Sequence, residues 1–269
     1  MNADAPLGVF DSGLGGLTVV RALREALPGE RIVYLGDTAR VPYGSKAPST
    51  VLKYALSCAR HLVARDVKAI VVACNTVSAV APERLRVELD IPVLEVIEPG
   101  ARAAVAATRT GRIGVLATAG TIASGAYPRA VGRLSTRAEV VGQPAPLLVP
   151  LAEEGWIEGE VPRLVVRRYV EPLAKAGVDV VVLGCTHYPL LRAVIEDEVR
   201  AHLGADAEVV DSARATAVTV RAFLEVRGLA RGGVDGSVEL LVTDIPRTFR
   251  EVAARFLGDE VREVEQVDL

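Results

Sequence analysis

AIVVACNT, residues 69–76, is repeated in outline as VVVLGCTH, residues 180–187. Each stretch is a short apolar run that ends in a cysteine followed by two polar residues. Runs of this length and composition are typical of buried strands, and the polar residues after each cysteine are typical of a helix start. We expect Cys74 and Cys185 to occupy equivalent strand ends in two similar halves of the molecule.

A second pair of stretches extends this internal similarity. LGVFDSGLGG at residues 7–16 is matched by IGVLATAGT at residues 113–121. Each half therefore reads as strand, polar loop and helix, and later as strand, cysteine, polar pair and helix. Ligands of open parallel sheets bind beyond the carboxyl ends of the strands, where all four loops would lie. Two such domains facing each other would present one thiol from each side of a cleft.

Short apolar runs alternate with amphipathic stretches such as residues 50–66 and 163–176. This alternation predicts an α/β fold of two pseudo-symmetric three-layer domains, with mainly parallel sheets and helices on both faces. The expected strands are LGVF at residue 7, RIVYLG at 31, AIVVA at 69, PVLEV at 92, RIGVLA at 112, AEVVG at 138, VDVVVLG at 178, AEVV at 207 and VELLVT at 238.

Composition narrows the class of protein. With 269 residues, half of them hydrophobic, and a formal net charge of -3, the chain is expected to be a soluble globular protein without the basic stripe of a nucleic-acid binder. No run approaches the roughly 18 apolar residues of a membrane span, and the N-terminus lacks a signal-peptide pattern, so the cytoplasm is the expected location. Three cysteines without CxxC spacing indicate free thiols, with neither disulfides nor a metal site.

The two strand-end cysteines are the candidate functional groups. A helix N-terminus after each would favour a thiolate at Cys74 and Cys185. His187, two residues beyond the second cysteine, is a candidate proton carrier. Cys58, by contrast, lies inside the helical stretch VLKYALSCARHLV and is expected to be a buried apolar residue.

DSGLGG, residues 11–16, invites comparison with dinucleotide-binding loops. The third glycine of G-x-G-x-x-G would fall at position 18, which is Thr18, so that interpretation is weak. We expect instead a tight turn that offers backbone N–H groups to a carboxylate, with Asp11 and Ser12 aimed into the cleft. TAGT, residues 118–121, occupies the matching place and could hold an anionic group, whereas VPYGS at residues 41–45 reads equally well as a plain loop.

Five motifs in this order, GVFDSGLGG, YLGDTARVPYG, VVACNT, PLAEEG and VLGCTHYPLL, cover nearly the whole chain. Together they resemble the glutamate racemases of the aspartate/glutamate racemase superfamily. The resemblance implies an isomerase that interconverts L- and D-glutamate without a cofactor or metal and supplies D-glutamate for peptidoglycan. It also implies a homodimer, a first domain of residues 1–97 and 209–269, and a second domain of residues 98–208, with the active site between them.

The resemblance also implies roles for individual residues. Cys74 and Cys185 would be the catalytic acid/base pair, assisted by Asp11, Asp37, Glu154 and His187. The substrate-binding residues would be Asp11, Ser12, Tyr43, Gly44, Asn75, Thr76, Thr118, Thr121, Thr186 and His187. Val77 stands where alanine is commoner in the family, a difference that concerns packing.

Racemisation explains why two cysteines would be matched by symmetry. A proton must leave one face of Cα and another must arrive on the opposite face, so two acid/base groups must flank that carbon. Two other classes stay open: a cysteine hydrolase with Cys74 as nucleophile and His187 as base, and a two-domain binding protein for a small anion. The hydrolase hypothesis does not explain the second cysteine. Aspartate or another acidic amino acid is the nearest competing substrate.

Overall fold

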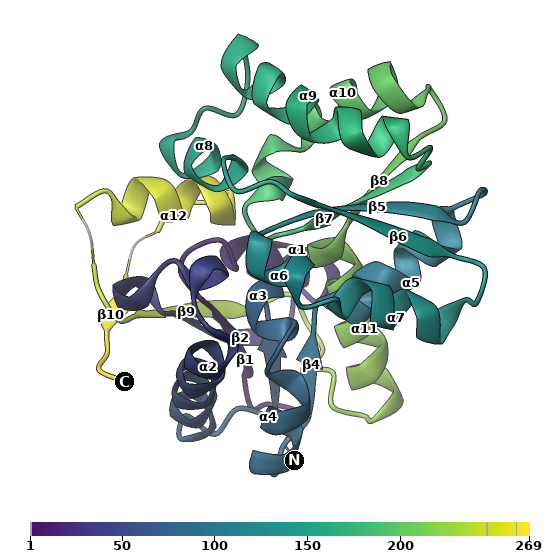
Figure 1. Ribbon diagram of the computed structural model, residues 1–269. Coiled ribbons are helices and arrows are strands. Elements are labelled where there is room, and N and C mark those ends of the chain that lie inside the picture. Colours follow the sequence, from purple (N-terminus) through teal and green to yellow (C-terminus); the bar gives the residue numbers. More distant parts are fainter. Residues whose placement is uncertain (1, 246, 262) are drawn as a thin grey trace.

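The computed structural model describes residues 2–245, 247–261 and 263–269. In this part of the chain the strands form two parallel sheets, a six-stranded one in the order β10-β9-β2-β1-β3-β4 and a four-stranded one in the order β6-β5-β7-β8 (Figure 1). The strand bounds are β1 Leu7–Asp11, β2 Arg31–Gly36, β3 Ala69–Val72, β4 Val93–Glu95, β5 Arg112–Ala117, β6 Glu139–Pro144, β7 Val180–Gly184, β8 Glu208–Asp211, β9 Ser237–Val242 and β10 Glu265–Gln266.

The two sheets repeat one topology, which confirms the predicted α/β fold with two similar halves. The order β2-β1-β3-β4 in the first sheet recurs as β6-β5-β7-β8 in the second. The strands that carry the matched sequences, β1 with β5 and β3 with β7, hold equivalent places. Every expected strand is present. The sequence reading missed only β10, whose two exposed residues give no apolar pattern.

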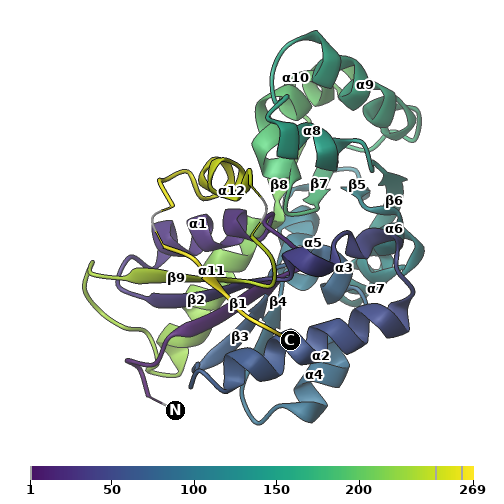
Figure 2. The same ribbon diagram turned by 90° about the vertical axis from the view of Figure 1, so that its left-hand side faces the viewer.

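Helices cover both faces of each sheet, and Figure 2 shows these layers edge-on. Alternate strand residues face opposite layers, so Leu7 and Val9 pack with α1, α11 and α12, whereas Phe10 packs with α2 and α4. In the second sheet α5 and α7 cover one face, and α8, α9 and α10 lie against the other. The helix bounds are α1 Leu17–Ala26, α2 Pro48–Val63, α3 Asn75–Ser78, α4 Pro82–Glu88, α5 Ile97–Ala107, α6 Ala119–Ala123, α7 Ala126–Leu134, α8 Leu148–Glu154, α9 Glu160–Lys175, α10 Arg192–Leu203, α11 Ser212–Val226 and α12 Phe249–Leu257. None of the helices described here is both long and apolar enough to cross a bilayer.

Two helices carry the chain between the sheets. Helix α5 leads from β4 into the second half, and α11 leads back from β8 toward β9. An acid stands at the start of each: Glu95 accepts hydrogen bonds from the N–H groups of Ile97 and Glu98, and Asp211 accepts one from the N–H of Ala213. Such capping satisfies N–H groups that the first turn of a helix leaves unpaired. The similarity of the two halves therefore extends to the helices that connect the two sheets, since each begins at a capping acid.

The domain division remains a proposal, and the pairing of β8 shifts one of its bounds. All four residues of β8 pair with β7, from Glu208 opposite Val180 to Asp211 opposite Leu183. The expected boundary after residue 208 would divide this strand after its first residue. We therefore propose a second domain of residues 98–211, with the first domain completed by the segment that begins at α11.

A buried ion pair joins distant segments at the base of the first domain. Lys68 Nζ lies 2.6 Å from a carboxylate oxygen of Glu30, and both side chains are fully buried. The same ammonium group donates to the carbonyl oxygens of Ala3 and Leu229. Glu30 also accepts from the N–H of Arg231. The pair thus holds the N-terminal segment, β3 and the loop before β9 together.

Replacing Lys68 by methionine should destabilise the protein by about 3–5 kcal/mol, because the Glu30 carboxylate would be left buried without its partner charge. The free energy of unfolding measured by urea denaturation checks this. Lys53→Met, at an exposed position of α2, is the matched control and should stay within about 0.5 kcal/mol of the unmodified protein. Equal stabilities for the two variants would contradict the assigned role of the pair.

Candidate active site

A small cavity of about 70 Å³ lies where the carboxyl ends of both sheets meet. Both halves of the molecule contribute to its wall, as the position of ligands in open parallel sheets predicts. Its lining residues are Ser12, Gly13, Val41, Pro42, Tyr43, Gly44, Cys74, Asn75, Thr76, Thr118, Val149, Glu153, Cys185, Thr186 and His187. One thiol from each half therefore faces the same cavity.

Cys74 is a buried thiol beside Ser12 and Asp11. It follows β3 at the start of the four-residue helix α3, and its Sγ lies 3.4 Å from Ser12 Oγ. Burial raises the pKa of Cys74 to about 12, and the charges of Asp11 and, more weakly, Cys185 act in the same direction. The N–H of Val77 in α3 does favour a Cys74 thiolate, as expected, but burial outweighs it. A helix of one turn has too small a dipole to offset the loss of hydration.

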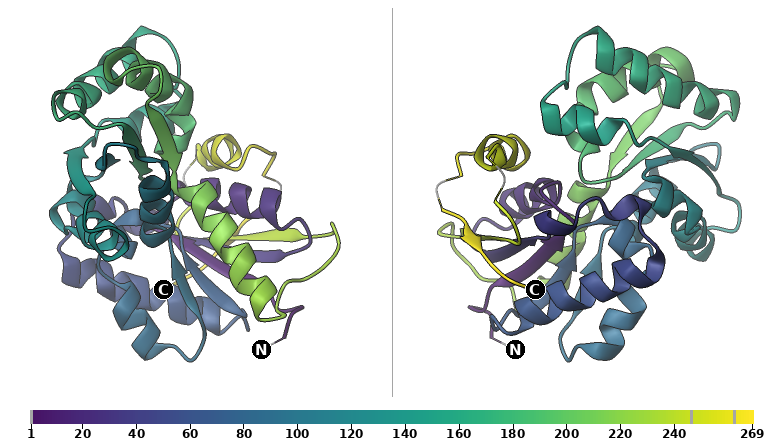
Figure 3. Two further views of the ribbon diagram at one scale, coloured as in Figure 1. Left: turned by 90° about the vertical axis from the view of Figure 1, so that its right-hand side faces the viewer. Right: turned by 60° about the vertical axis from the view of Figure 1, so that its left-hand side comes forward.

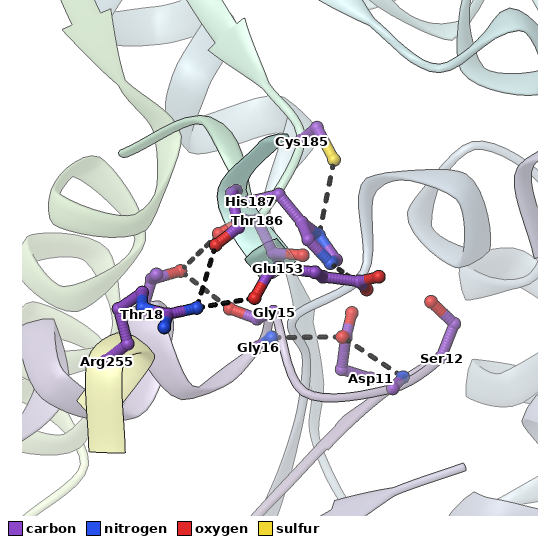
Figure 4. Close-up of polar contacts among 12 residues, drawn as sticks. Asp11, Ser12, Gly15, Gly16, Thr18, Glu153, Cys185, Thr186, His187 and Arg255 are labelled. Carbon is purple, nitrogen blue, oxygen red and sulfur yellow. Dashed lines mark hydrogen bonds and ion pairs between the residues drawn. The ribbon is translucent and has the colours of Figure 1, made fainter. Parts of the chain in front are cut away.

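Cys185 has a different partner, the imidazole of His187. Its Sγ lies 3.8 Å from His187 Nδ1, while His187 Nε2 lies 2.9 Å from Glu153 Oε1 (Figure 4). Burial alone would lower the pKa of His187, but its contacts with Cys185 and Glu153 outweigh this and raise the pKa to about 10. The α-helix expected directly after Cys185 begins only at Arg192, behind a 3₁₀ helix over Tyr188–Leu191. The positive charge beside this thiol comes from an imidazolium.

The acid that reaches His187 is Glu153, whereas the resemblance pointed to Glu154. Both are exposed residues on the last turn of α8, but Glu153 lines the cavity and Glu154 does not. Successive residues of a helix point about 100° apart, so only one of two neighbouring acids can face the cavity. We therefore propose that Glu153, and not Glu154, has the role of assisting His187.

Asp11 and its glycine turn form a self-contained unit. Asp11 Oδ2 accepts hydrogen bonds from the N–H groups of Gly13 at 3.3 Å and Gly16 at 2.9 Å (Figure 4). The turn thus offers its N–H groups to a carboxylate, as expected, but to the carboxylate of its own Asp11. The other oxygen, Oδ1, is buried and has no hydrogen-bond partner among the described residues. Burial raises the pKa of Asp11, the condition for a group that exchanges protons.

Asp37 does not line the cavity, but it binds the hydroxyl group of Tyr43, which does. It is fully buried, and its carboxylate accepts hydrogen bonds from the Tyr43 hydroxyl, from Arg40 Nε and from Thr243 Oγ1. Tyr43 and the neighbouring Gly44 form part of the cavity wall. The assisting role implied for Asp37 therefore becomes a positioning role in our interpretation.

A cluster of hydroxyl and amide groups closes the cavity at the start of α3 and α6. Thr76 Oγ1 lies 3.0 Å from Thr118 Oγ1, and Thr121 Oγ1 is within 3.4 Å of Thr76 and 3.1 Å of Thr118. Asn75 Oδ1 accepts a hydrogen bond of 2.8 Å from Tyr127, while its buried Nδ2 has no partner in the described structure. Thr121 supports the other two threonines from behind, since it does not line the cavity.

Two glycines lie where the halves of the molecule come closest. A Cβ on Gly15 would lie 2.4 Å from Thr186 Oγ1 and 2.5 Å from His187 Nδ1, and one on Gly44 would lie 2.9 Å from Thr118 Cβ. A side chain at either position would therefore force the neighbouring threonine or histidine side chain to move. Thr18 Oγ1 reinforces the first contact by donating a hydrogen bond of 2.9 Å to the carbonyl of Thr186.

The comparison with known proteins now identifies the family. Residues 14–220 match the Asp/Glu/hydantoin racemase family. The chain belongs to that family. A glutamate racemase of Geobacter metallireducens is 51% identical over 264 residues, which cover 98% of this chain and 96% of the relative. The crystal structure of glutamate racemase from Francisella tularensis in complex with D-glutamate has a TM-score of 0.90 at 35% identity and covers 99% of this chain and 98% of that one.

A second solved structure supports the same assignment. The glutamate racemase of Thermus thermophilus, in complex with beta-chloro-D-alanine, has a TM-score of 0.88 at 43% identity and covers 100% of this chain and 99% of that one. The protein is therefore an amino-acid racemase, an isomerase. Among the described residues no group of three or more His, Cys, Asp and Glu side chains is placed to hold a metal ion.

Sequence reasoning missed several parts of this racemase site. Glu153 and Val149 reach the cavity from α8, and Val41 and Pro42 extend the wall beside Tyr43. PLAEEG gave two adjacent acids, and only the phase of the helix decides between them. The wall residues Val41 and Pro42 belong to the VPYGS stretch, whose composition left a plain loop equally probable.

Glu153→Gln should lower the pKa of His187 from about 10, because the carboxylate that stabilises the imidazolium through Nε2 would become neutral. Histidine-selective NMR across a pH titration measures this directly. Glu154→Gln, one residue further along the same helix, is the matched control and should leave the His187 titration unchanged. If Glu154→Gln gave the larger shift, the assignment of Glu153 would be wrong.

Proposed function

We propose that the protein interconverts L- and D-glutamate without a cofactor, with Cys74 and Cys185 as the acid/base pair. The observation that carries this proposal is the pair of thiols that line one cavity from opposite halves of the molecule. A racemase needs acid/base groups on both faces of Cα, and pseudo-symmetric strand ends supply one for each face. Relatives at about half identity are named glutamate racemases, which supports glutamate as the substrate.

The two thiols have different surroundings. The pKa of Cys74, raised to about 12 by burial, keeps that group protonated near neutral pH. Cys185 has the His187 imidazole as its neighbour instead, with Nδ1 at 3.8 Å from its Sγ. In one direction we propose that Cys74 gives its proton to one face of Cα while Cys185 takes the proton from the opposite face. The carbon keeps its substituents and inverts.

In the reverse direction the roles are exchanged, and Cys74 must first lose its proton. Asp11 is the candidate acceptor, because burial raises its pKa and its Oδ1 has no partner among the described residues. The ammonium group of the substrate would add a positive charge in the cavity and favour the thiolate. Ser12, at 3.4 Å from Cys74 Sγ, can hold the sulfur in place through the exchange.

The polar groups of the cavity wall suit an acidic amino acid. Asn75 Nδ2, Thr76, Thr118 and Thr186 offer donors to carboxylate oxygens. Tyr43 and Gly44 close the wall on another side. A structure of a relative contains D-glutamate, which fits this chemistry. Aspartate stays the nearest competitor, and a cytoplasmic homodimer that supplies D-glutamate for peptidoglycan is the proposed setting.

The alternative hypotheses receive less support from the geometry. A cysteine hydrolase with Cys74 as nucleophile needs the imidazole beside that sulfur, but His187 contacts Cys185 and Glu153 instead. A binding protein for small anions would have no use for a second thiol in its cavity. Cys58 does not enter the comparison, since it lies on the buried face of α2, within the core.

Incubation of the purified protein with L-glutamate, without added pyridoxal phosphate or metal, should yield a racemic mixture in chiral chromatography. Cys74→Ser and Cys185→Ser should each lower the rate by at least about 100-fold, because a hydroxyl is a much poorer acid/base than a thiol. Cys58→Ser is the control and should keep nearly full activity. Equal losses at all three positions, or conversion of L-aspartate faster than L-glutamate, would contradict the proposal.

A further inference from the structure

Helix α12 belongs to the C-terminal segment but lies beside the active site. It follows β9 of the first sheet and packs on α1 (Figure 3). Its last turn reaches α8 and the loop after β7, which belong to the second half of the molecule. The helix therefore contacts both halves behind the Cys185 side of the cavity.

Arg255 holds the end of α8. Its Nη1 donates to the carbonyl oxygens of Glu153 at 2.5 Å and Ala152 at 3.5 Å (Figure 4). A guanidinium at the C-terminus of a helix binds carbonyls that lack intrahelical partners. Arg255 Nη2 also lies 3.1 Å from a carboxylate oxygen of Glu251, one turn earlier on α12. Gly155 makes room, because a Cβ there would lie 2.7 Å from Arg255 Cζ.

Phe256, the next residue, contacts the imidazole itself. Its ring lies edge-on to that of His187, with centroids 5.0 Å apart and an interplanar angle of 79°. Phe256 is fully buried in the main core cluster, so its ring has a fixed position. One turn of α12 thus contacts both members of the His187–Glu153 pair from the side opposite the cavity.

We propose that Arg255 and Phe256 are positioning residues, which hold Glu153 and His187 in the geometry that brings the imidazolium to Cys185. The inference rests on the proposed function of this triad. Arg255 fixes the backbone from which the Glu153 side chain extends, and Phe256 limits rotation of the imidazole ring. In the described structure α12 makes no corresponding contact on the Cys74 side of the cavity. The positioning by Arg255 and Phe256 therefore concerns Cys185 alone.

Steady-state rates alone cannot show whether Arg255 and Phe256 act on the Cys185 side or on the Cys74 side of the cavity. The equilibrium constant between two enantiomers is one, so any variant must lower kcat/KM equally in both directions. A direct readout of His187 is therefore needed. The groups that face this imidazole are Cys185 from its own loop, Glu153 from α8 and Asp11 from the end of β1, with Arg255 behind Glu153.

The test is histidine NMR on the full-length protein combined with kinetics. The chain has three histidines, so the His187 signals can be assigned with His61→Gln and His202→Gln. Arg255→Ala should lower the pKa of His187 by about one unit, a tenfold change in its protonation equilibrium, because the Glu153 carboxylate would no longer be held against Nε2. Loss of the Arg255 charge alone would act in the opposite direction, so a lowered pKa reports the loss of positioning. Arg255→Ala should also lower kcat for glutamate by roughly 10-fold with little change in KM, the scale of a small misplacement of a catalytic group.

Two further variants make the result decisive. Arg250→Ala, an exposed arginine on the same helix, should leave both readouts unchanged. Arg255→Lys keeps a charged donor, so its His187 pKa and its kcat should lie between those of the unmodified protein and those of Arg255→Ala. If Arg255→Ala does not fold, Arg255→Lys is the variant to measure. An unchanged His187 titration in a folded Arg255 variant overturns the inference, whatever its activity. Absence of racemisation in the unmodified protein would count against the proposed function. The His187 titration would still test whether Arg255 positions Glu153.

Discussion

The close approach of Gly15 to Thr186 and His187 is the contact on which the rest of the site depends. It brings the turn after β1 against the loop after β7, and so brings the carboxyl ends of two separate sheets to one cavity. A side chain at position 15 would force these loops apart and would separate the thiols of Cys74 and Cys185. The placement of the two sulfur atoms thus depends on the packing of the Gly15 backbone against the Thr186 and His187 side chains.

The fold is nearly symmetric, but the proton chemistry built on it is not. Topology, strand-end cysteines and capped crossing helices recur in both halves. One thiol is buried beside a carboxyl group, whereas the other lies beside an imidazolium held by a glutamate. Racemisation requires only that each carrier can both take and give a proton, so the two need not be alike. Helix α12 adds a further difference, because it supports the Cys185 side.

The sequence predicted those features of the structure that depend on neighbouring residues. The strands, the two halves and the strand-end cysteines follow from apolar periodicity and repetition. The choice between Glu153 and Glu154 depends on the rotation of α8 against the core, which adjacent identical residues cannot reveal. The thiolate expected at Cys74 failed because burial, a property of the whole fold, outweighs a one-turn helix. The contact of Arg255 with Glu153 joins residues 102 positions apart and leaves no pattern in the sequence.

The two-thiol mechanism is tested most directly by the origin of the hydrogen on Cα. If Cys74 and Cys185 flank that carbon, the thiol that delivers the proton has already exchanged with solvent before the substrate binds. In deuterated water, L-glutamate should therefore give early D-glutamate that carries deuterium at Cα, while the remaining L-glutamate stays largely protiated. D-glutamate as the starting material should give the mirror result. Early product that keeps substantial protium at Cα would contradict the account.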